Sequence, residues 1–73
     1  MILSVKQARV LAGKTQQEMA KSMGIHRHTY AKIEQDPEIA TIRQAEEIAR
    51  ITGFDLEQIF FGLKSTFSRK RTL

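Results

Sequence analysis

The segment TQQEMAKSMGIHRHTYAKIEQ, residues 15–35, decides the fold, because it predicts two short helices joined by a tight turn. Gly24 lies between the two halves, and glycine readily adopts the left-handed conformation that ends a helix. Ala20 is small where the two helices would cross, so they can pack closely. Residues 15–23 and 26–35 are therefore predicted to form a helix-turn-helix pair.

The second helix of this pair has an unusual polar face. At about 100° per residue, one side carries hydrogen-bond donors and a small residue but no acid: Arg27, His28, Ala31, Lys32 and Gln35. The opposite side is predicted to face the core through Thr29, Tyr30 and Ile33. Solvated helix faces commonly mix charges of both signs three or four residues apart. An acid-free helix held outward by its neighbour suits the major groove of DNA, which is about 12 Å wide.

Further helices are predicted on both sides of the pair. In a capping box, a side-chain oxygen accepts from a free amide and the residue three positions later reaches back. That spacing occurs at Ser4…Gln7, Thr15…Glu18, Thr41…Gln44 and Asp55…Gln58. The five predicted helices span residues 4–12, 15–23, 26–35, 41–52 and 55–61. No stretch alternates with period two, so we expect an all-α, five-helix domain without strands.

Apolar residues at helical spacing predict the core. The residues expected inside are Val5, Ala8, Leu11 and Ala12; Met19, Ala20 and Met23; Ile42, Ala45, Ile48 and Ala49; and Phe54, Leu56, Ile59 and Phe60. Phe61 and Leu63 follow the last predicted helix with little chain left to cover them. We therefore expect these two residues to form part of the interface of a weak homodimer.

Composition restricts the class of protein. The 73 residues suit one small domain, predicted at residues 1–63, with a basic and flexible tail at 64–73. The absence of cysteine excludes a disulfide framework and a thiolate metal site, and it suits a reducing, cytoplasmic setting. The first residues lack a sustained apolar stretch, so we expect neither a signal peptide nor a membrane span.

The formal net charge of +4 is unevenly distributed. Residues 1–35 hold six Lys or Arg and two acids, residues 36–63 hold two and six, and residues 64–73 hold four and none. The domain is therefore polarised into a basic half and an acidic half, and the tail supplies the excess charge. This distribution favours a protein that turns one face toward a polyanion.

The segment TQQEMAKSMGIHRHTYAKIE, together with IRQAEEIARITGF at residues 42–54, resembles the helix-turn-helix of the Cro and repressor proteins of lambdoid phages and of related bacterial regulators. The likeness covers about residues 3–62. It implies a cofactor-free domain that binds double-stranded DNA and controls transcription, usually as a dimer on a two-fold operator. The short length favours a Cro-like or stand-alone repressor over the larger two-domain phage repressors.

The resemblance also implies roles for single residues. Arg27, His28 and Lys32 occupy its base-reading positions, and Arg9 and Glu34 correspond to an ion pair that ties the first helix to the end of the third. The residues expected to contact DNA phosphates are Gln16, His26, Thr41 and Arg43. Thr41 and Arg43 are included because the loop at residues 36–40 lacks the basic side chains that, in the family, often contact the DNA backbone.

Other functions find less support. His26 and His28 point about 200° apart on a helix and cannot chelate one ion, so we expect no metal. The chain has no nucleophile–base spacing, phosphate-binding glycine loop or HExxH motif, so we expect no enzyme and no small-molecule substrate. An antitoxin-type module, which binds a protein partner and its own operator, stays open. RNA is a weaker alternative, because a helix cannot read the narrow groove of duplex RNA.

Overall fold

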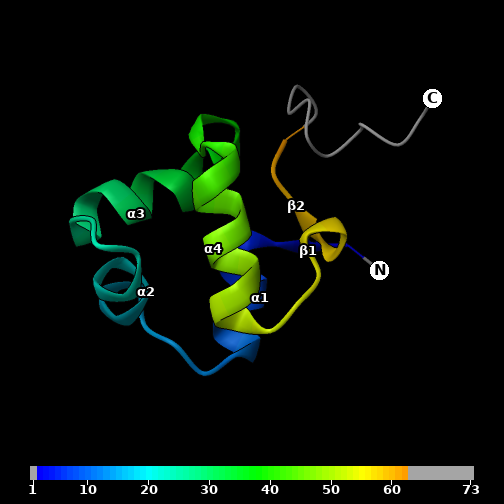
Figure 1. Ribbon diagram of the computed structural model, residues 1–73, viewed down its shortest axis with the longest axis horizontal. Helices are drawn as coiled ribbons and strands as arrows, with labels where there is room; N and C mark the ends of the chain where they lie inside the picture. The colour runs from blue at the N-terminus through cyan, green and yellow to red at the C-terminus, as the bar shows by residue number, and fades with distance from the viewer. Residues whose placement is uncertain (1, 63–73) are drawn as a thin grey trace.

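The computed structural model describes residues 2–62, and Figure 1 shows their arrangement. The α-helices of this part are α1 (Val5–Leu11), α2 (Gln16–Met23), α3 (Arg27–Gln35) and α4 (Ile42–Thr52). Two single-turn 3-10 helices, η1 (Pro37–Ile39) and η2 (Leu56–Gln58), and two short strands, β1 (Leu3–Ser4) and β2 (Ile59–Phe60), complete it. The predicted tail at 64–73 lies outside the described residues.

The predicted capping boxes set where the helices begin. The side chains of Ser4, Thr15 and Thr41 accept hydrogen bonds from the amides three residues later and start α1, α2 and α4, respectively. These bonds satisfy amides that would otherwise have no partner within the first helical turn. Gly24 ends α2 with a φ of 71°, the left-handed conformation expected at this position.

The fifth predicted helix and the expected absence of strands are wrong. Residues 55–61 form the single turn η2 followed by β2, which pairs with β1 in parallel, with Leu3 opposite Ile59 and Ser4 opposite Phe60. The residues after Gln58 are β-branched or aromatic and fit an extended, half-buried strand. The domain is therefore mostly helical, with four α-helices among the described residues and one small sheet.

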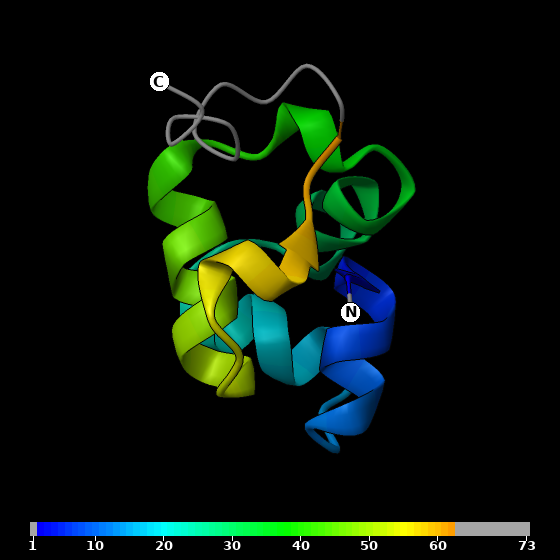
Figure 2. The same cartoon turned by 90° about the vertical axis from the view of Figure 1, so that its right-hand side faces the viewer.

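The core lies where the helix pair, α4 and the sheet meet. In Figure 1, α2 and α3 lie on one side of α4, and β1 and β2 lie on the other. Figure 2 shows η2 and β2 running from the end of α4 toward α1. The largest completely buried side chains are Tyr30, Phe61, Met19, Ile33, Ile48, Ile59 and Val5.

Several residues expected in the core are exposed. Leu11 is 66% exposed, Ile42 52% and Phe60 44%, and Thr29 is exposed as well. Leu11 is the last residue of α1 and Ile42 the first of α4, so each lies where its helix meets solvent. Phe60 faces outward because its neighbours Ile59 and Phe61 face inward, and side chains alternate along a strand.

The expectation that Phe61 lacks cover from its own chain is also wrong. Phe61 is completely buried in the core of the described domain, and Leu63 lies outside the described residues. The short sheet explains the difference, because its pairing with β1 draws the chain after η2 across the core. The Phe61 ring is therefore not exposed at the surface, where a second copy of the chain could contact it.

Replacing Phe61 should therefore destabilise the monomer. We expect Phe61→Ala to lower the free energy of unfolding by about 3–5 kcal/mol, as large-to-small changes of buried aromatic residues do. Phe60→Ala is the matched control, and its loss should stay near about 1 kcal/mol because the ring is already half in water. Urea unfolding followed by circular dichroism measures both, and equal losses would contradict the burial of Phe61.

Candidate nucleic-acid interface

The outer face of α3 is exposed and carries no acid. Arg27, His28 and Lys32 are exposed, and Ala31 between them is half-buried. The single acid in α3 is Glu34, whose side chain is only 5% exposed and is bonded to α1. The three predicted base-reading residues therefore share one basic surface. Thr29, which we expected to face inward, joins them at the surface.

The core holds α3 firmly in this orientation. Tyr30 and Ile33, on its inner side, are buried, and Ile25 in the preceding turn packs against the same core. The amide of Ile25 donates to the carbonyl of Ala20 at 3.0 Å, which closes the turn at the end of α2. The polar face is thus presented by a helix whose position is set by packing rather than by a loop.

An ion pair ties α3 to α1. The Arg9 Nε and Glu34 Oε2 atoms are 2.6 Å apart, and the two side chains are 12% and 5% exposed. Arg9 also donates from Nη1 to the carbonyl of Lys14 at 2.9 Å. This is the pair that the resemblance implied, and it lies largely out of water.

Gln16 links the ion pair to Arg27 on the outer face of α3. Its Nε2 donates to Glu34 Oε1 at 3.0 Å, and its Oε1 accepts from Arg27 Nη1 at 3.4 Å. Because the carboxylate can only accept, it fixes the Gln16 amide with its oxygen free for Arg27. The Glu34 carboxylate therefore orients Gln16, and Gln16 in turn holds the Arg27 side chain.

The electrostatics of this cluster favour its charged form. Burial alone would raise the pKa of Glu34, but the hydrogen bonds from Arg9 and Gln16 outweigh burial and hold that pKa below its usual value. The hydrogen bond to Glu34 raises the pKa of Arg9. Burial, aided by the nearby Glu34 carboxylate, raises the pKa of Tyr30. The raised pKa keeps the Tyr30 hydroxyl protonated. This buried hydroxyl has no hydrogen-bond partner within residues 2–62.

The predicted phosphate-binding residues are spread more widely. Gln16 stands at the start of α2, and His26 precedes α3 without a capping bond from its side chain. Thr41 uses its hydroxyl oxygen to accept from the Gln44 amide at 3.0 Å, and Arg43 is exposed one residue into α4. Neither Thr41 nor Arg43 lines the hollow between α1 and α3 or the hollow between α2 and the start of α3.

Those two hollows bring in lysines that the sequence did not single out. One, of about 380 Å³, lies between α1 and α3 and is lined by Lys6, Arg9, Gln16, Ala31, Glu34 and Gln35. The other, of about 390 Å³, lies between α2 and the start of α3 and is lined by Gln17, Ala20, Lys21, Ile25, His26 and Arg27. One feature of the sequence points to Lys6 as a site residue: α1 contains no acidic residue that could neutralise it.

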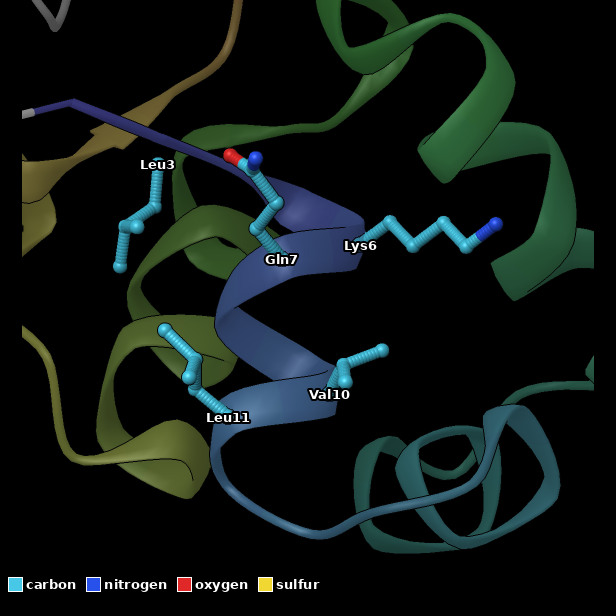
Figure 3. A pocket seen from close by; sticks show the side chains of 5 residues that line it. All are labelled: Leu3, Lys6, Gln7, Val10 and Leu11. Carbon is cyan, nitrogen blue, oxygen red and sulfur yellow. The ribbon is translucent and has the colours of Figure 1, made fainter.

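A third hollow, on the outer side of α1, is apolar. It measures about 320 Å³ and is lined by Leu3, Lys6, Gln7, Val10 and Leu11, as Figure 3 shows. Leu3 and Leu11 lie on one side of the helix, and Lys6 extends from the other side toward the ribbon of α3. Val10 and Leu11 are both more than half exposed, so this face has no cover from the described residues.

The described part of the chain contains neither a metal-binding cluster nor a membrane-spanning helix. In residues 2–62, no cluster of three or more His, Cys, Asp or Glu side chains is placed to hold a metal ion. Within the same range, every helix is too short or too polar to cross a membrane.

Comparison with known proteins gives one match. A family model described as helix-turn-helix matches residues 5–59, which span α1 through the first residue of β2. The searches of curated proteins and of solved structures found no match.

Breaking the ion pair by removing one partner should destabilise the domain strongly, and the effect should depend on pH. Arg9→Ala leaves Glu34 buried without its partner and should lower the free energy of unfolding by about 3–5 kcal/mol. Because the pKa of Glu34 is lowered on folding, the stabilisation is complete above the usual value of 4.5 and is lost as pH falls through the folded pKa. The difference in free energy of unfolding between wild type and Arg9→Ala should therefore become smaller at acidic pH.

Urea unfolding of both proteins between neutral pH and about pH 3 measures this difference. Arg50→Ala is the control, because Arg50 is an exposed cation on α4 and its loss should change stability by about 0.5 kcal/mol or less. A small effect of Arg9→Ala that does not vary with pH would show that the pair is solvated.

Proposed function

Because the chain belongs to the helix-turn-helix family of Cro- and repressor-like DNA-binding regulators, we propose that it is a sequence-specific repressor of the Cro-like or stand-alone kind. The observation that carries this proposal is the acid-free outer face of α3, held in place by the core and by Arg9 and Glu34. The ligand is an operator in double-stranded DNA.

In the proposed complex, α3 lies in the major groove. Arg27 and Lys32 donate to O6 and N7 of guanines, the commonest specific contact of basic side chains, and His28 reads a neighbouring base. Ala31 lies between these side chains and lets the helix approach the bases closely. Gln16 holds Arg27 at 3.4 Å, so part of the ordering of this long side chain precedes DNA binding.

Phosphate contacts fix the register of the helix on the duplex. We assign them to Gln16 at the start of α2 and to His26 before α3, with Thr41 and Arg43 at the start of α4 as more distant contacts. A homodimer on paired half-sites about 34–36 Å apart completes the proposal. The buried position of Phe61 leaves the dimer contact to other residues.

The base-reading role of Arg27 can be tested directly. Selection from a random duplex library supplies the operator, and Arg27→Ala should weaken binding to it by about 1–3 kcal/mol and relax the preference at one base pair. Arg50→Ala removes the same charge from α4 and should leave the preference unchanged. An equal loss on the operator and on a scrambled duplex would contradict base reading by Arg27.

The tail should behave differently from α3. Lys64, Arg69, Lys70 and Arg71 lie outside the described residues, and we propose that they bind the DNA backbone without regard to sequence. Deleting residues 64–73 should weaken binding to all duplexes alike and reduce the salt dependence by about 0.9 in slope for each phosphate that the tail neutralises. Titrations at several salt concentrations measure this, and a truncated protein without base preference would contradict the assignment.

A second candidate function follows from the apolar hollow on α1. An antitoxin needs a protein-binding surface apart from its DNA-binding face, and the exposed side chains of Val10 and Leu11 offer an uncovered one. Binding of the product of a neighbouring gene, abolished by Leu11→Glu while DNA affinity stays unchanged, would favour this function over a stand-alone repressor.

A further inference from the structure

The hollow between α1 and α3 lies beside the proposed base-reading face, and none of Arg27, His28 and Lys32 lines it. It adjoins the outer face of α3, because Ala31 and Gln35 form part of its lining, and it also adjoins the start of α2 through Gln16. A DNA strand that follows α3 from the start of α2 toward Gln35 therefore passes over this hollow. Lys6 of α1 lines its remaining side.

The charges in the hollow leave one cation free. Arg9 and Glu34 neutralise each other at 2.6 Å, and Arg9 is further occupied by the carbonyl of Lys14. Lys6 is exposed and makes no hydrogen bond or ion pair within residues 2–62. The free charge of the hollow is therefore the Lys6 ammonium group, and a phosphate is the complementary ligand.

The chain beyond α3 cannot supply this charge. Residues 36–40, which contain η1, carry Asp36 and Glu38 and no Lys or Arg. Acids at this end of α3 repel a DNA backbone. Lys6 comes from a different part of the chain, and Figure 3 shows its side chain extending from α1 toward α3. Its position compensates for the missing basic residues of the loop.

We propose that the hollow between α1 and α3 is a phosphate-binding site for the DNA backbone, with Lys6 as its cation and Gln35 as a neighbouring donor. This inference rests on the proposed DNA-binding function and adds a contact from α1 to it. The contact is to a phosphodiester group, so it strengthens binding to every sequence and orients α3 without reading bases.

The test uses the full chain and the Lys6→Met variant, which removes the charge and keeps the aliphatic stem. Titration of the selected operator and of an unselected duplex at several salt concentrations should give a salt slope smaller by about 0.9. Affinity at about 0.1 M salt should fall roughly 8-fold on both duplexes, with their ratio unchanged. Lys6→Arg should restore both values, and Arg50→Met, which removes a cation from α4, should change neither ratio nor slope.

Neutralising the DNA instead of the protein locates the contact. A series of operators is prepared, each with one uncharged methylphosphonate at a different position. At one of these positions the substitution should weaken wild-type binding as much as Lys6→Met does. The same substitution should not weaken the binding of the Lys6→Met variant any further. Additive losses at every position would overturn the assignment. An increase in melting temperature with inorganic phosphate alone, seen in wild type and not in Lys6→Met, would identify a site for free anions instead.

The outcomes separate this inference from the function on which it rests. If wild type selects an operator but Lys6→Met keeps its salt slope, the phosphate site is wrong and the repressor proposal stands. If wild type selects no sequence but binds unselected duplex with a Lys6-dependent slope, sequence-specific recognition is wrong and the phosphate site stands. If wild type binds no DNA, both are wrong.

Discussion

The geometry of the interface depends on one buried ion pair. Arg9 and Glu34 join α1 to the end of α3, and both side chains are almost completely removed from water. Such a pair gains little net stability, because the desolvation of two charges offsets most of their attraction. Removing one of the two side chains is nevertheless costly, because the remaining charge would stay buried without a partner. The pair therefore adds a specific contact between α1 and α3 to the packing of the core, and it adds little net stability.

The same pair determines what α3 exposes. Glu34 is the single acid of the helix, and its burial leaves Arg27, His28 and Lys32 without a negative neighbour on their own helix. The second carboxylate oxygen holds Gln16, which in turn accepts from Arg27. One buried carboxylate thus removes negative charge from the surface and also orders a surface cation. A neutral substitute at position 34 could fill the space but could not accept from Arg9 and Gln16 together with the same strength.

Local signals predicted the helices, and long-range contacts explain what they missed. Capping boxes at Ser4, Thr15 and Thr41 and the glycine at 24 act within one turn, so the sequence shows them directly. The pairing of Leu3 with Ile59 joins opposite ends of the described chain, and two-residue strands are too short to show a period. The burial of Phe61 follows from that pairing and was missed with it. Of the candidate site, the sequence indicated the face of α3 and, by resemblance, the ion pair; it could not show that Lys6 on α1 borders the same hollow as Gln35.

The distribution of charge also limits how a duplex can approach. Basic residues of α1, α2 and α3 lie before position 35, and the acids of η1, α4 and η2 follow it, so the charge changes sign at the C-terminal end of α3. A backbone drawn to the first group is repelled by Asp36 and Glu38 as it leaves α3. Closest contact is then favoured along the side of α3 that faces α1, where Gln16, Ala31 and Gln35 border the hollow with Lys6. The acidic loop and the free lysine act in the same direction: together they bias the DNA toward α1, and the ion pair beneath keeps that helix beside α3.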